Sequence, residues 1–130
     1  MSESPIGERL AALEAAVGRL RTALAQPRSE WTRDAAIQRF EFSHELAWKA
    51  IRALAVREGL RCASPRQAWR VARELGWLDD DALWLDMQAD RNRPSHTYSE
   101  AVADAIFARL DDYAHALGEL AARLGREARD

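Results

Sequence analysis

Apolar residues recur three or four positions apart in two long stretches, one near each end of the chain. The first stretch carries Leu10, Leu13, Val17, Leu20 and Leu24. The second carries apolar side chains at positions 102, 106, 110, 113, 117, 120 and 124. This spacing places each set on one face of an α-helix. The sequence therefore predicts an amphipathic helix over about residues 6–26, ended by Pro27, and another that begins around Ser99.

The segment between these stretches predicts three further helices. Apolar residues at positions 37, 40, 47, 51 and 54 predict a long helix that ends at Gly59. The Ser-Pro pair at 64–65 is a helix-start signal, so a short helix is predicted from there to Gly76. Three consecutive aspartates favour the start of a fourth helix. That helix must end near Arg93, because Pro94 disfavours helical backbone in the residue before it.

Amino-acid composition favours helices over strands. Alanine occupies 26 of the 130 positions, whereas Ile, Val and Thr together occupy 11. β-Branched residues favour strands, so their scarcity argues against a sheet. A chain of this length buries one hydrophobic core. We therefore expect a single domain over residues 1–130 with an all-α fold, an antiparallel up-and-down bundle of about five helices.

Charge is nearly balanced over the whole chain but unevenly distributed along it. The net charge of −2 argues against a broad basic surface for non-specific duplex binding. Of the 19 basic residues, 18 are arginine, which either favours bidentate contacts with phosphate and carboxylate or reflects GC-rich codon usage. Arg66, Arg70 and Arg73 share a helix face that could contact RNA or a partner enzyme. A solvated face paired with neighbouring acidic residues is the favoured interpretation.

The chain carries no sign of export or membrane insertion. Cys62 is its only cysteine, so no intramolecular disulfide forms and the thiol is expected to lie inert in a loop. Residues 1–7 lack the apolar segment of a signal peptide, and no apolar run approaches the roughly 20 residues of a membrane-spanning helix. We expect a cytoplasmic protein without a membrane partner.

The isolated histidines and the tryptophans receive structural interpretations. His44 and His115 each have a glutamate at helical spacing, Glu41 and Glu119, and both are interpreted as solvated pairs. Neither has the second histidine of a helical metal site, so no metal and no cofactor is predicted. The five tryptophans are expected to be mostly core or interface residues.

Reactive side chains gather in residues 90–98, Asp-Arg-Asn-Arg-Pro-Ser-His-Thr-Tyr, between two predicted helices. Catalytic and binding residues are often carried by such connections. Asn, Pro and Ser are also ordinary turn formers, and Arg is favourable near a helix C-terminus. Spacing alone therefore leaves a functional segment and a plain turn as equal interpretations.

A family resemblance bears on this segment. Residues 91–96, Arg-Asn-Arg-Pro-Ser-His, resemble the R-N-x-x-x-H signature of HEPN domains, and Tyr98 completes the R-x4-H-x-Y form of the HepT toxins. Over about residues 33–120, the chain is similar to the bacterial nucleotidyltransferase substrate-binding family of the same superfamily. The supporting stretches are residues 37–42, 45–49, 64–66 and 83–87. His44 departs from the family pattern, in which an aromatic residue is expected.

The resemblance implies a helical bundle that forms a homodimer, with the motifs of both subunits facing a shared cleft. It also implies metal-independent RNA cleavage, with Arg91 and His96 as the catalytic residues. Histidine titrates near neutral pH and can move protons, and a fixed guanidinium can stabilise charge on a phosphate. Asn92, Arg93 and Ser95 are expected to bind or orient the substrate.

The implied partner is a minimal nucleotidyltransferase that acts as the antitoxin. In HepT systems this partner is taken to transfer AMP to the motif tyrosine, here Tyr98. Such a modification would block RNA by its charge and volume. The alternative is a non-catalytic subunit whose cleft binds a nucleotide or the substrate of the partner enzyme. A purely structural helical adaptor would leave the Arg-Asn-His-Tyr segment unexplained.

Overall fold

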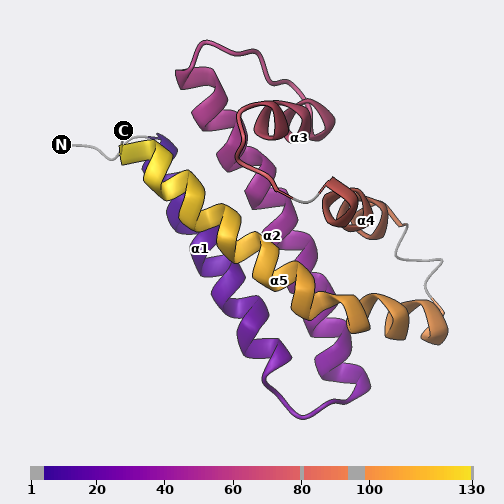
Figure 1. The fold of residues 1–130 in the computed structure, drawn as a ribbon. Coiled ribbons are helices and arrows are strands. Elements are labelled where there is room, and N and C mark those ends of the chain that lie inside the picture. Colours follow the sequence, from indigo (N-terminus) through magenta and orange to yellow (C-terminus); the bar gives the residue numbers. More distant parts are fainter. Residues whose placement is uncertain (1–4, 80, 94–98, 130) are drawn as a thin grey trace.

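The computed structural model describes residues 5–79, 81–93 and 99–129. Its helices are α1 (Pro5–Leu24), α2 (Glu30–Arg57), α3 (Pro65–Glu74), α4 (Asp81–Arg91) and α5 (Glu100–Arg129), shown in Figure 1. The expected all-α helical bundle is confirmed. None of the described helices is long and apolar enough to cross a membrane.

The three long helices, α1, α2 and α5, form the body of the bundle (Figure 1). α1 and α2 form an antiparallel hairpin, in which the guanidinium of Arg39 donates to the carbonyl oxygen of Arg19 at 2.8 Å. α2 and α5 run in the same direction. Their starts meet where Arg33 contacts Glu100, and their ends meet where Arg57 donates to carbonyl oxygens in the last turn of α5. The long helices thus depart from the expected up-and-down alternation, because the segment with α3 and α4 carries the chain back to the starting end of α2.

The core lies between these three helices. Phe40 of α2 and Tyr113 of α5 are fully buried, and their rings stack with centroids 5.1 Å apart. The apolar stripes predicted at the two ends of the chain supply much of the remaining core: Leu10, Leu13, Val17, Leu20, Ile106, Leu110, Leu117, Leu120 and Leu124. Burial of each such side chain contributes about 1.5–3 kcal/mol. Both predicted stripes therefore face the core.

Local signals set the helix ends. Ser29 and Thr32 form a capping box at the start of α2, in which each side-chain oxygen accepts a hydrogen bond from the other residue's backbone N–H, at 3.1 and 2.8 Å. Gly59 and Gly76 have φ angles of +80° and +77°, a region that other residues rarely adopt, and they follow the ends of α2 and α3. α1 ends at Leu24, slightly before the predicted boundary.

The short helices α3 and α4 lie together on one side of the long helices (Figure 1). Trp69 of α3 and Trp84 of α4 are both buried, and their ring centroids lie 5.0 Å apart. Cys62 is buried in the loop before α3, as expected for an inert thiol. Trp31 is the exception among the tryptophans at 85% exposed. It lies two positions before the buried Arg33, which places it on the opposite face of α2.

Candidate functional site

The predicted motif begins at the C-terminal end of α4. Arg91 is the last residue of this helix, and Asn92 and Arg93 follow it directly. The backbone N–H of Asn92 still donates to a carbonyl oxygen one turn earlier, at 3.0 Å, so the helical geometry persists to this point. Three predicted site residues lie outside the described residues: Ser95, His96 and Tyr98. Their roles stay predictions.

Asp90, the residue before Arg91, anchors this end of α4 to α5. Its carboxylate is 3% exposed and accepts two hydrogen bonds from the Arg109 guanidinium, both at 2.8 Å, and one from the Tyr113 hydroxyl at 2.6 Å. The Nε of Arg93 lies 3.3 Å from the same carboxylate. Burial alone raises the pKa of Asp90, but the hydrogen bonds from Arg109 and Tyr113 outweigh it, so the pKa lies below its ordinary value. The ionised carboxylate thereby fixes the helix turn that carries Arg91.

The sequence pattern assigns no role to Asp90, Arg109 or Tyr113. One signal was present, because Tyr113 falls on the apolar stripe of the last predicted helix and a buried phenol needs a hydrogen-bond partner. That partner lies 23 residues earlier in the chain, on another helix. Only the tertiary structure identifies it as Asp90.

The guanidinium of Arg91 points toward α2. One of its nitrogens lies 3.8 Å from a carboxylate oxygen of Glu45, and the ammonium of Lys49 lies 3.4 Å from the other oxygen. Burial alone raises the pKa of Glu45, but the neighbouring positive charges and hydrogen bonds lower it overall. The Arg91 and Glu45 side chains are each 36% exposed, and exposed pairs of this kind are weak. Arg91 is therefore a charged group that an anionic ligand could draw away from Glu45.

His44 lies near this arginine, inside the protein. It is 3% exposed, and its ring centroid lies 4.8 Å from that of Trp69 and 6.0 Å from that of Phe40. Burial, followed by the charge of Arg91, lowers the pKa of His44 to about 4, so the imidazole is neutral at pH 7. The predicted solvated pair with Glu41 is wrong, because position 44 lies one turn after Phe40 on the buried face of α2. The imidazole takes the place of the aromatic ring expected in the family.

The second histidine behaves as predicted. The Nε2 of His115 lies 3.0 Å from a carboxylate oxygen of Glu119, and the two side chains are 75% and 71% exposed. This solvated pair is confirmed. Within residues 5–79, 81–93 and 99–129, no group of three or more His, Cys, Asp or Glu side chains could hold a metal ion.

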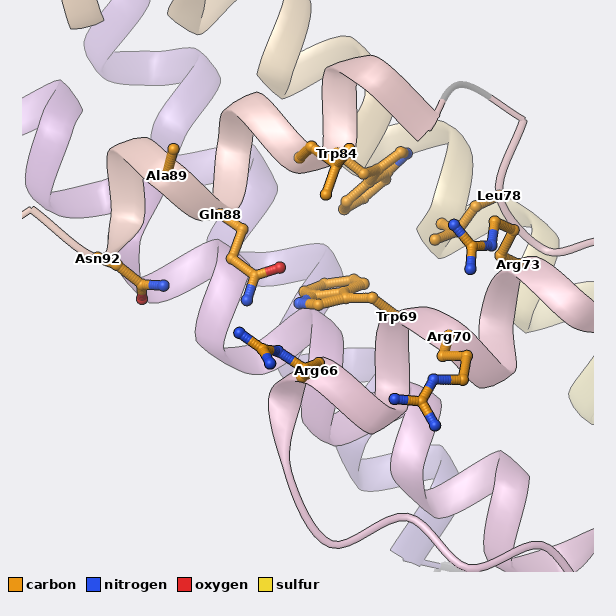
Figure 2. A pocket seen from close by; sticks show the side chains of 10 residues that line it. Arg66, Trp69, Arg70, Arg73, Leu78, Trp84, Gln88, Ala89 and Asn92 are labelled. Carbon is orange, nitrogen blue, oxygen red and sulfur yellow. The ribbon is translucent and has the colours of Figure 1, made fainter.

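A pocket of about 490 Å³ opens between α3 and α4, beside the start of the motif (Figure 2). Its arginines lie on the α3 side, one tryptophan of each helix faces the other, and polar side chains lie on the side of α4 and the residue that follows it. The side chains that line it are Arg66, Trp69, Arg70, Arg73, Leu78, Trp84, Leu85, Gln88, Ala89 and Asn92. None of these described lining residues is acidic. The predicted pairing with acidic neighbours is not found for Arg66 and Arg70, which form no ion pair with any described residue.

Comparison with protein families tests the resemblance seen in the sequence. Residues 8–126 match the family described as "Nucleotidyltransferase substrate binding protein like". The chain belongs to this family. The membership confirms the resemblance inferred from the ordered stretches between residues 37 and 87. The match also includes α1 and most of α5, which lie outside those stretches.

Two known proteins are similar to this family member. A Haemophilus influenzae protein named a probable ribonuclease HepT is 30% identical over 83 residues, which cover 60% of this chain and 57% of the relative. The chain thus spans less than two thirds of that relative's length. A crystal structure of a Thermus thermophilus protein matches with a TM-score of 0.80 and 44% identity, over 86% of this chain and 98% of the other.

Proposed function

We propose that this family member is the companion subunit of a minimal nucleotidyltransferase and acts as a HepT-like, metal-independent ribonuclease toxin. The observation that carries the proposal is the order of Arg91, His96 and Tyr98, which has the spacing of the HepT motif and begins at the anchored end of α4. The family match and the ribonuclease name of the Haemophilus relative support it.

The proposed reaction is cleavage of an RNA phosphodiester by the neighbouring ribose hydroxyl. One His96 accepts the proton of the 2′-hydroxyl, whose oxygen then attacks the phosphorus. The 5′-oxygen leaves and takes a proton from a second His96, which gives a 2′,3′-cyclic phosphate and a 5′-hydroxyl. Arg91 stabilises the negative charge that builds on the phosphate oxygens. Asn92, Arg93 and Ser95 bind or orient the substrate.

This chemistry requires two subunits, because each chain supplies a single Arg91 and His96. A homodimer with two-fold symmetry brings both copies into one cleft. Light scattering at micromolar concentration should therefore give the mass of a dimer. A monomer under these conditions overturns the proposed site.

Neutralisation is proposed to act on Tyr98. Transfer of AMP from ATP to the phenol oxygen, with release of pyrophosphate, places a bulky anion in the cleft. After incubation with the partner enzyme and ATP, intact-mass spectrometry should show a gain of whole AMP units, and Tyr98→Phe should show none. An unchanged mass of the parent protein contradicts this step.

The decisive experiment combines RNA cleavage with toxicity on expression. His96→Ala should abolish both, while His115→Ala should change neither, because His115 is an exposed histidine paired with Glu119 on α5. Cleavage should also persist in the presence of a metal chelator. Cleavage or toxicity that survives His96→Ala rejects catalysis by this residue.

A second function is favoured by the family description, which names substrate binding. In that case the polar end of α4 binds a nucleotide or the substrate of the partner enzyme and cleaves nothing. Nucleotide binding by the purified protein, without RNA degradation at any concentration tested, would select this alternative.

A further inference from the structure

We propose that the pocket between α3 and α4 binds single-stranded RNA, with its phosphates held by Arg66 and Arg70. The inference rests on the proposed function for its choice of ligand and extends it to a second region of the surface. The pocket then acts as a binding track, which means that it holds part of the RNA strand at a distance from the bond that is cut and directs the strand toward the motif.

Charge is the first argument. Arg66 and Arg70 are exposed, they lie one turn apart on α3, and their guanidinium groups form no hydrogen bond or ion pair with any described residue. The pocket has three arginines and no acidic side chain among its described lining residues, although the chain as a whole has a net charge of −2. Unpaired guanidinium groups favour the bidentate geometry of phosphate oxygens.

The aromatic pair in the pocket is the second argument. Trp69 and Trp84 face each other between α3 and α4, and Arg66 and Arg70 lie on the α3 side of this pair (Figure 2). The Nε1 of Trp69 is buried and has no hydrogen-bond partner among the described residues, and in Figure 2 the nitrogen-bearing edge of this ring is turned toward Arg66 and Gln88. An unmet buried donor is costly, and an oxygen acceptor that enters at this edge would satisfy it. Aromatic rings beside exposed arginines suit a base with its phosphate.

Position is the third argument. Asn92 forms one end of the pocket in Figure 2 and directly follows Arg91, the first residue of the motif. A strand that lies over Arg66 and Arg70 would reach Arg91 by passing Asn92. The volume of about 490 Å³ is within the range of ligand sites, so one nucleotide unit fits and the rest of a strand must continue outside. A longer anion that extends toward the motif is therefore favoured over a free mononucleotide.

The test uses the full-length protein in a His96→Ala background, so that RNA stays intact. Binding of a short fluorescein-labelled single-stranded RNA is followed by fluorescence anisotropy at several salt concentrations. Replacing Arg66 and Arg70 by Ala should weaken binding by about fivefold each and reduce the slope of log affinity against log salt by about 0.7 for each phosphate contact. Arg61→Ala is the matched control, because Arg61 is an exposed arginine in the loop before α3 that does not line the pocket. It should change affinity less than about twofold. Unchanged circular dichroism would show that the variants are folded.

Three results would overturn the inference. The first is RNA affinity that stays within about twofold of the parent in the Arg66→Ala, Arg70→Ala double variant. The second is AMP binding that matches the oligonucleotide and falls equally in the variants, which would make the pocket a mononucleotide site. The third is loss of nucleotidyltransferase binding with RNA affinity retained, which would make it a protein interface.

A kinetic readout separates this inference from the proposed function. In the active protein, the double variant should raise the KM for RNA and leave kcat unchanged, because these contacts lie away from the reacting bond. If His96→Ala leaves cleavage intact while the arginine variants weaken RNA binding, the catalytic proposal fails and the binding track stands. If His96→Ala abolishes cleavage while the arginine variants change neither affinity nor KM, the binding track fails alone.

Discussion

Replacing Asp90 by Ala removes the carboxylate that joins α4 to α5. The Tyr113 hydroxyl, which is fully buried, loses its acceptor, and a buried group without a partner costs about 1–3 kcal/mol. The Arg109 side chain is 40% exposed, so water replaces part of its two lost hydrogen bonds and the loss there is about 1 kcal/mol. We expect Asp90→Ala to lower the free energy of unfolding by about 3 kcal/mol, near the lower end of the range for broken buried pairs.

A second variant makes the reasoning specific. Tyr113→Phe keeps the ring that stacks on Phe40 and removes only the hydroxyl, so it should cost about 1–2 kcal/mol in the parent protein. In the Asp90→Ala background the same change removes an unpaired buried hydroxyl and should be neutral or stabilising. The two substitutions are therefore expected to be strongly non-additive.

Urea unfolding followed by far-ultraviolet circular dichroism measures the free energy of unfolding of the parent, the two single variants and the double variant, at one fixed protein concentration. Additive effects of Asp90→Ala and Tyr113→Phe would refute the argument, because they would mean that the hydroxyl and the carboxylate do not depend on each other.

The low pKa of Asp90 also makes its contribution to stability depend on pH. Its stabilisation is present above the ordinary carboxyl pKa near 4 and is lost as the pH falls through the lower folded value, so the gap between the parent and Asp90→Ala should narrow in acid.

Three further outcomes are expected. The pKa of His44 is about 4 in the folded protein, so the unfolded chain binds the proton at a higher pH than the folded protein does. About 3 kcal/mol of stability is therefore lost as the pH falls from about 6.5 to 4. His44→Phe should remove this loss from unfolding curves measured at different pH values, and curves identical to those of the parent would contradict the assignment. Gly18→Ala should raise the free energy of unfolding by about 0.5–1 kcal/mol, because Gly18 lies in α1 with open space around it. Gly59→Ala should lower the free energy of unfolding by about 1–2 kcal/mol, because Gly59 has a positive φ. Equal effects of the two variants in thermal melts would argue against this account. Ser29→Ala should cost about 1 kcal/mol by removing the cap of α2, and a melting temperature unchanged from the parent would exclude that role.

Much of the fold follows from local patterns. The apolar spacing between Leu10 and Leu24 predicts α1, and the same spacing predicts α5, because helix periodicity depends only on neighbours along the chain. Gly59 and Gly76 mark helix ends for an equally local reason, since their backbone angles exclude most other residues. The parallel direction of α2 and α5 is not local, because it depends on how α3 and α4 fold back between them.

The candidate site divides in the same way. The order Arg91, Asn92, His96 and Tyr98 is visible in the sequence, and together with the supporting stretches between residues 37 and 87 it indicates the family, which the match over residues 8–126 confirms. The surroundings of Arg91 are not visible there. Its neighbour Glu45 comes from α2, so no spacing within the motif could reveal it.

The sequence by itself determined the helices, the family and the order of the motif residues, because each depends only on residue types and their spacing along the chain. The tertiary structure decided which polar groups are buried and which are accessible. His44 is neutral and enclosed, Asp90 is ionised between α4 and α5, and Arg66 and Arg70 line a pocket without an ion pair to any residue that the structure describes. The physical reason is that burial and pairing depend on distances through space, and packing sets these distances between segments that are far apart in the chain.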